Sequence, residues 1–227
     1  SYFQADRMVE YAPWLRTRIS AIYNGLDLQQ FRPTAAKKLP GTLLAVGSVT
    51  PIKNAFGLAQ ALGRYRDSFG APPVIHWAGS VHSTDRSQTE FKKVNDFLRE
   101  RDLLDNWEWL GENKNMPAVY GRYIGLIHPS FLEGLPNAVC EAMACGVPVL
   151  ASDVCEHPRL VRTGETGFRF DPNQPFDIAE TMRRFLCLPV DEQLAMSQRC
   201  RSFAELEFDF QVYLNRYEHL FTTLTEA

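Results

Sequence analysis

The sequence predicts an α/β fold, with a Rossmann-like, doubly wound parallel sheet, helices on both faces and a helical tail at the C-terminus. From Thr42 onward, apolar runs too short for helices alternate with longer amphipathic stretches. Near-continuous apolarity in short runs is typical of strands that helices cover on both faces. The alternation ends after Phe170, where helical patterns take over. Strict alternation of strands and helices indicates a parallel sheet.

The chain is expected to open with a helix and a short strand. Residues 2–15 are amphipathic and mostly polar, and residues 19–23 predict a strand that ends at the turn signal Asn24-Gly25. Phe31 is expected to be a buried anchor. A polar connection over residues 34–39 leads into the main sheet.

The main sheet and its helices follow in order along the chain. The predicted strands cover residues 42–46, 74–77, 107–110, 125–127 and 147–150. The predicted helices cover residues 55–69, 85–104, 116–123 and 136–145, and the tail helices cover residues 178–186, 191–207 and 210–224. Right-handed crossovers place every strand-to-helix loop at one edge of the sheet, where ligands bind in folds of this kind.

Composition excludes several classes of partner. With 227 residues, 45% of them hydrophobic, the chain can bury one sizeable core. A net charge of -3, a pI near 6.0 and the lack of a Lys/Arg block argue against nucleic acid and anionic membrane surfaces. The cysteines, odd in number and without metal-ligand spacing, predict reduced thiols in a cytoplasmic protein. No apolar run approaches the roughly 18 residues that span a bilayer.

The most informative segment runs from Glu133 to Gly146. Two acids, Glu133 and Glu141, bracket a loop that becomes a helix. Pro136 has the fixed φ of a first helical turn, and Gly146 suits a left-handed cap that ends the helix. At helical spacing, Glu141 is expected to emerge from a patch of small side chains that would serve as a docking surface, formed by Asn137, Ala144 and Cys145.

This segment resembles the E-x7-E motif of retaining nucleotide-sugar glycosyltransferases of family 4 (glycosyl transferases group 1), whose two-domain architecture is called GT-B. The resemblance spans nearly the whole chain and matches only the C-terminal, donor-binding half. It implies that Glu141 binds the ribose hydroxyls and Glu133 the hydroxyls of the transferred sugar. A carboxylate accepts hydrogen bonds from neighbouring hydroxyls. Backbone groups at the helix start would hold the diphosphate, in a loop formed by Gly134, Leu135, Pro136 and Asn137.

Further segments resemble other parts of the family's donor site. The stretch from Val46 to Asn54 resembles V-G-R-x4-K-G, with Lys53 in place but Ser48 where arginine is usual. Either the site relies on Lys53, Ser48 and backbone amides, or it binds phosphate more weakly. Other candidate donor contacts at strand ends are Gly79, Gly111 and Ser130.

Some neighbouring side chains are expected to be structural. His128 is interpreted as a buried histidine with satisfied hydrogen bonds, and Met116 and Tyr120 as core residues. Arg159 replaces the glutamate that the family usually has after a proline. No role is therefore carried over to Arg159.

The resemblance implies a division of the chain into three parts. Residues 1–33 would be an opening helix and strand on the interdomain hinge side, and residues 34–187 the nucleotide-sugar-binding domain. Residues 188–227 would be C-terminal helices that cross back to an N-terminal domain. Because the chain begins with Ser1 inside a helical pattern, it is expected to be a piece of a longer protein.

The predicted function is that of the donor half of a retaining glycosyltransferase, with Glu133 and Lys53 as the candidate catalytic residues. It would move a sugar from a nucleoside diphosphate sugar, such as a UDP- or GDP-sugar, to a glycan, lipid or small-molecule acceptor. The acceptor domain, and any contact with a membrane, would belong to the N-terminal half. No D-x-D triplet is present, so neither a metal nor another cofactor is expected. The alternative is a non-catalytic sugar-nucleotide binding module or an inactive relative.

Overall fold

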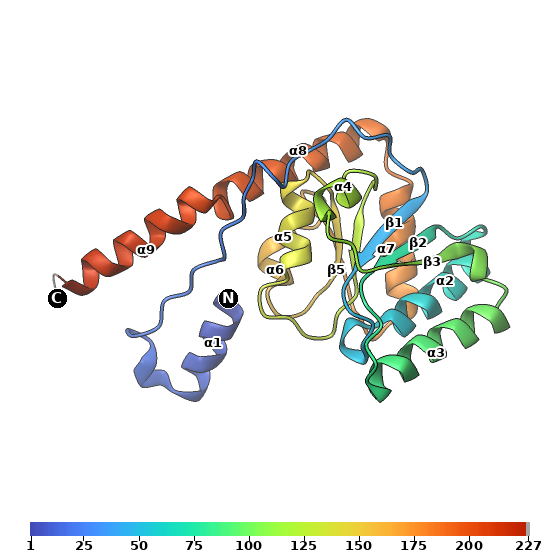
Figure 1. Cartoon of the computed structure of the whole chain (residues 1–227), viewed down its shortest axis with the longest axis horizontal. Helices are drawn as coiled ribbons and strands as arrows, with labels where there is room; N and C mark the ends of the chain where they lie inside the picture. The colour runs from blue at the N-terminus through green and yellow to red at the C-terminus, as the bar shows by residue number, and fades with distance from the viewer. Residues whose placement is uncertain (226–227) are drawn as a thin grey trace.

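The structure is a computed structural model that describes residues 1–225, and its centre is a six-stranded sheet in the order β3-β2-β1-β4-β5-β6 (Figure 1). Every neighbouring pair of strands is parallel. The strands are β1 (Thr42–Val46), β2 (Val74–Ala78), β3 (Trp107–Gly111), β4 (Leu126–His128), β5 (Val149–Ser152) and β6 (Gly167–Phe170). This order confirms the predicted doubly wound fold.

Helices cover both faces of the sheet, as predicted. Consecutive residues of β1 point to opposite faces, so Leu43 joins one core cluster and Leu44 the other. The first cluster contains side chains of α2 (Ala55–Phe69), α3 (Asp85–Glu100) and α7 (Pro175–Leu186). The second contains side chains of α4 (Met116–Tyr120), α5 (Asn137–Ala144), α6 (His157–Leu160) and α8 (Val190–Glu207).

The predicted strand over residues 19–23 is wrong. These residues pair with no strand, and the nearest pairing after them is an isolated bridge between Leu26 and Asp209. Tyr23 is buried instead through its ring, and its hydroxyl donates to Glu156 Oε1 at 2.6 Å. Phe31, expected to be buried, packs against the core while staying partly exposed. Residues 19–23 thus have the apolar pattern of a strand, but no neighbouring strand is available for them to pair with.

Strand β6 is not among the predicted strands, because the glycines at and before its start, Gly167 and Gly164, are typical of turns. Gly164 does adopt a turn conformation, with φ +84. Gly167 opens β6, and a Cβ built on it would lie 1.7 Å from the carbonyl oxygen of Val149 in β5. Glycine is needed there because the two backbones approach closely.

Several helix ends differ from prediction, and α4 ends at Tyr120 and α7 begins at Pro175, each three residues from the predicted bound. Helix α5 begins at Asn137, and Pro136 is its N-cap with extended backbone instead of a first helical residue. Helix α3 ends at Glu100, and Asp102 beyond it has a left-handed φ of 49. The predicted cap at Gly146 is confirmed by its φ of +66.

The terminal helices flank the sheet domain. Helix α1 (Tyr2–Tyr11) lies beside the loops near α5 and α6, and α9 (Phe210–Thr225) projects away from the sheet (Figure 1). Among residues 1–225, no helix is both long enough and apolar enough to cross a membrane.

Candidate functional site

The candidate site lies where the sheet reverses its winding, between β1 and β4. The loop after β1 leads to α2 on one face, and the loop after β4 leads to α5 on the other, so a crevice is expected between them. The two loops are joined by the Phe131 amide, which donates to the Ile52 carbonyl at 2.8 Å. All the predicted site residues lie toward this carboxyl edge, at the end of a strand, in the loops that follow β1 to β4 or in the first two turns of α5: Ser48, Lys53, Gly79, Gly111, Ser130, Glu133, Gly134, Leu135, Pro136, Asn137 and Glu141.

The two candidate catalytic residues contact each other. Lys53 Nζ lies 2.5 Å from Glu133 Oε1, and the two side chains are 24% and 11% exposed. His128 Nε2 lies 2.9 Å from the same oxygen. Burial alone would raise the pKa of Glu133, but His128 and Lys53 outweigh it and hold that pKa well below its usual range. Glu133 is therefore ionised and already held in place.

Buried polar side chains support Glu133 from beneath. The Ser130 hydroxyl, in a side chain 1% exposed, lies 3.3 Å from His128 Nε2. The ring of His128 meets the ring of His157 edge-on, with centroids 5.2 Å apart. The Ser152 hydroxyl donates to the Ser130 carbonyl at 2.6 Å. His128 is buried as expected, and its contact with Glu133 makes it part of the site.

His157 completes this layer, and no role was predicted for it. Its Nδ1 lies 3.1 Å from the hydroxyl and 3.0 Å from the carbonyl oxygen of Ser152. Burial lowers the pKa of His157 to about 3. His157 is therefore a neutral imidazole in the layer beneath Glu133.

The second acid is held by a core tyrosine. The Tyr120 hydroxyl donates to Glu141 Oε2 at 2.9 Å, and Tyr120 is fully buried. Burial raises the pKa of Glu141, and the hydrogen bond from Tyr120 opposes this rise. Tyr120 is thus both the predicted core residue and the partner that fixes one oxygen of Glu141.

The expected patch of small side chains around Glu141 is not a surface. Ala144 and Cys145 are buried, and Asn137 is exposed. Helix α5 packs here against α8, from which Arg201 Nη1 donates to the Ala144 carbonyl at 2.8 Å. The accessible residues of α5 are Asn137, Ala138 and Glu141.

The loop that carries Lys53 is fixed by Asn54. This residue has a left-handed φ of 58 and caps α2, where its side chain accepts from the Gly57 amide at 3.1 Å. Its Nδ2 donates to the carbonyls of Pro129 and Pro172, at 3.1 and 3.0 Å. Lys53 is therefore held near the loop after β4 by its neighbour.

Gly79 is required by a close approach within the protein. A Cβ built on it would lie 1.9 Å from the Gly47 carbonyl oxygen, to which Trp77 Nε1 also donates at 2.7 Å. The role of Gly79 as a donor contact stays a prediction. Gly111 has φ +68 and open space around it.

Helix α1 borders the loop between β4 and α5 that carries Glu133, called the acidic loop below. This contact was not predicted from the sequence. The Gln4 side chain would lie 3.3 Å from a Cβ on Gly134. The Phe3 amide donates to Glu156 Oε2 at 2.7 Å, and Arg159 pairs with Asp6 at 2.6 Å. Arg159, which departs from the family pattern, therefore has a partner on α1.

Relatives of the chain are known in sequence and in structure. The chain is 23% identical to a sucrose synthase of Denitrovibrio acetiphilus over 82% of this chain and 25% of that protein. It is 38% identical to the O-antigen chain mannosyltransferase B of Escherichia coli over 59% of this chain and 33% of that protein. The chain thus spans a quarter to a third of these relatives.

Solved structures share the fold. A glycosyltransferase from Rickettsia africae has a TM-score of 0.87 and 17% identity, over 99% of this chain and 62% of that one. HepE of Anabaena in complex with UDP has a TM-score of 0.80 and 19% identity, over 90% of this chain and 57% of that one. The family model "Glycosyl transferases group 1" matches residues 28–204. The chain belongs to the glycosyl transferases group 1 family.

Proposed function

We propose that this chain binds the nucleoside diphosphate of a sugar donor at the carboxyl edge of the sheet. In the whole protein, this half would serve a retaining, metal-independent transfer of the sugar to an acceptor held by an N-terminal domain. The observation that carries the proposal is the pair Glu133 and Glu141 on either side of the start of α5, with Lys53 in contact with Glu133. The UDP and UDP-glucose complexes of HepE support a uridine donor.

The start of α5 suits a diphosphate. The Pro136 carbonyl accepts from the amides of Val139 and Cys140, at 2.9 and 3.2 Å. The amides of Asn137 and Ala138 donate to no group within residues 1–225. Unpaired amides and the helix dipole both favour a negative charge at this end.

Lys53 would exchange partners when donor binds. Its ammonium now shares Glu133 Oε1 with His128. In the proposed complex it turns to the diphosphate and stabilises charge on the departing oxygens. His128 keeps Glu133 oriented, so the carboxylate can accept from the sugar hydroxyls. Glu133 then positions the sugar and does not attack it.

A ligand-detected NMR panel of UDP, GDP and ADP tests the proposal directly. We expect saturable binding of UDP or GDP by this chain, together with negligible transfer because the acceptor half is not part of it. If no nucleoside diphosphate binds at millimolar concentration, the proposed donor site is wrong.

The second candidate is a binding module without catalysis, favoured by Ser48 in place of arginine. Serine supplies neither the charge nor the paired donors of a guanidinium. Transfer and donor hydrolysis by the whole protein separate the two functions. Donor binding without either reaction, over a broad panel of acceptors, would support the binding module.

Glu133→Ala is expected to spare UDP and to weaken UDP-sugar. The bare nucleotide lacks the hydroxyls that Glu133 would accept from, so only the sugar nucleotide should lose affinity, by about fivefold. Calorimetric titration of Glu133→Ala and of Glu133→Gln with both ligands measures this. Equal losses for the two ligands would contradict the proposed role of Glu133.

A further inference from the structure

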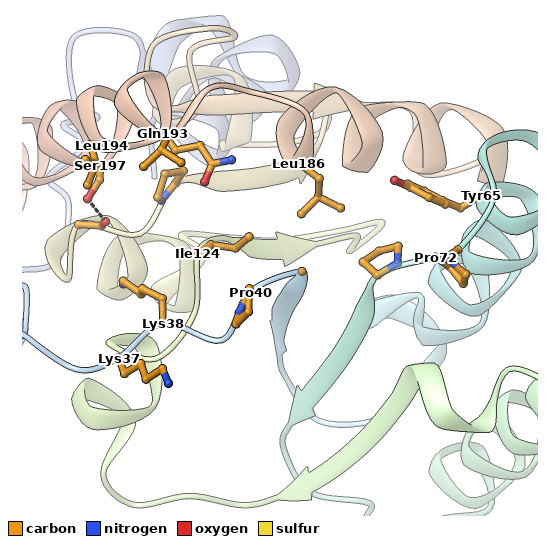
Figure 2. Close-up of a pocket in the computed structure, with 16 residues that line it drawn as sticks. Lys37, Lys38, Pro40, Tyr65, Pro72, Ile124, Leu186, Gln193, Leu194 and Ser197 are labelled. Atoms are coloured by element: carbon orange, nitrogen blue, oxygen red, sulfur yellow. Dashed lines mark hydrogen bonds between the residues drawn. The ribbon is translucent and has the colours of Figure 1, made fainter.

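A cavity lies at the opposite, amino edge of the sheet. Figure 2 shows it between the amino ends of the strands and the junction of α7 with α8. Its volume is about 670 Å³, within the range of small-molecule sites. The donor site uses the carboxyl ends of the same strands, so the two sites are separate.

The walls of this amino-edge pocket are rigid and apolar. Pro40, Pro73 and Pro148 each stand just before a strand and line it, together with Ile124 and Leu186. Proline has a fixed φ and no amide hydrogen, so such a wall neither collapses easily nor offers backbone donors. The pocket is therefore preformed for an apolar body.

One end of the pocket carries an unpartnered tyrosine hydroxyl. Tyr65 is only 8% exposed, and its hydroxyl points into the pocket in Figure 2. This hydroxyl forms no hydrogen bond with any group in the described chain. Burial raises the pKa of Tyr65, so the group remains a donor. The ring is buried, while the hydroxyl faces the open pocket, where an acceptor on a ligand can replace water as its partner.

The other end carries a positive charge. Lys37 and Lys38 both line the pocket, and Figure 2 shows them across it from Tyr65. The Lys38 ammonium donates to the Tyr123 carbonyl at 2.9 Å. The exposed Lys37 has no ion pair within residues 1–225, and no lining residue is acidic. Both lysines contribute positive charge, and Lys37 is the one whose ammonium makes no hydrogen bond within residues 1–225.

We infer that the amino-edge pocket binds a free amphiphilic carboxylate. Its anionic group pairs with Lys37, its hydrocarbon body lies against the proline walls and Leu194, and a second oxygen at its far end accepts from Tyr65. Lys37, the apolar wall and the Tyr65 hydroxyl follow one another across the cavity. A purely apolar ligand would leave both polar ends unused, and a cationic ligand would be repelled by Lys37. This site is independent of the proposed donor site.

Methyl NMR titrations of the whole chain test the inference with decanoate, decanol and ω-hydroxydecanoate below their aggregation limits. We expect saturable shifts of the Ile124, Leu186 and Leu194 methyls, with decanoate bound more tightly than decanol. Lys37→Gln should weaken decanoate about threefold, the effect of one exposed ion pair, and leave decanol unchanged. The parent chain should bind ω-hydroxydecanoate about fivefold more tightly than decanoate, because of the hydrogen bond with Tyr65. Tyr65→Phe, which keeps the aromatic ring in the core, should abolish this preference.

The matched control is Lys92→Gln, which removes a 77% exposed lysine side chain on α3 and should leave every affinity unchanged. Absence of methyl shifts at the highest soluble decanoate concentration overturns the inference. The inference is also overturned if neither Lys37→Gln nor Leu194→Glu changes the affinity for decanoate. UDP titration of the same variants should match the parent chain, so a failure of the donor site would appear separately.

Discussion

Replacing Glu141 by alanine is expected to weaken the binding of UDP by about 1 to 3 kcal/mol, the cost of leaving hydrogen-bonding groups unpaired. Tyr120 holds Glu141 Oε2, and the other carboxylate oxygen has no partner within the described chain. In the proposed complex, that oxygen accepts from the ribose hydroxyls. Alanine removes the acceptor from a partly buried place where water replaces it poorly.

The single variant also leaves the buried Tyr120 hydroxyl without an acceptor, so part of its effect would be on stability. Combining Glu141→Ala with Tyr120→Phe removes donor and acceptor together and should restore much of the lost stability. The double variant should bind UDP as weakly as Glu141→Ala. Calorimetric titration and thermal melts of the single and double variants separate the two effects.

Glu100→Ala is the matched control, because it removes an exposed acid at the end of α3, away from the acidic loop. It should change neither UDP affinity nor melting temperature by more than the error of measurement. If Glu141→Ala binds UDP with the affinity of the parent chain, the ribose assignment is wrong.

Most of the fold was predictable because burial on both faces leaves a clear pattern. The runs at residues 42–46 and 55–69 match β1 and α2 residue for residue. The segment at residues 19–23 has a similar short apolar pattern and forms no strand, because pairing depends on a neighbour that the local sequence does not specify. Strand β6 was lost for the opposite reason, since Gly167 serves a strand contact that resembles a turn in sequence.

The site residues were predictable as a set at one sheet edge, and their contacts were not. Lys53 and Glu133 are far apart in the chain, and their ion pair depends on how Asn54 ties one loop to the other. His128 has the composition of a core histidine, and only its distance to Glu133 shows that it holds this carboxylate. The roles of these residues toward a donor stay predictions.

Gly79→Ala is expected to destabilise the protein by about 3 kcal/mol or more, because a Cβ would collide with backbone. That Cβ would lie 1.9 Å from the Gly47 carbonyl oxygen, and Gly79 has φ +156, which side chains rarely adopt. Relief of the clash requires the loop after β1 to move. The Trp77 bond to Gly47 and the position of Lys53 would then be disturbed.

Gly111→Ala provides the comparison that isolates the clash. Gly111 also has a positive φ, +68, but a Cβ there would meet nothing within 4 Å. Its cost should be that of the left-handed conformation alone, about 1 kcal/mol. In urea unfolding, the free energy of unfolding of Gly79→Ala should therefore be at least about 2 kcal/mol lower than that of Gly111→Ala. Equal stabilities would show that the loop after β1 yields freely, in which case Gly79 does not set the position of Lys53.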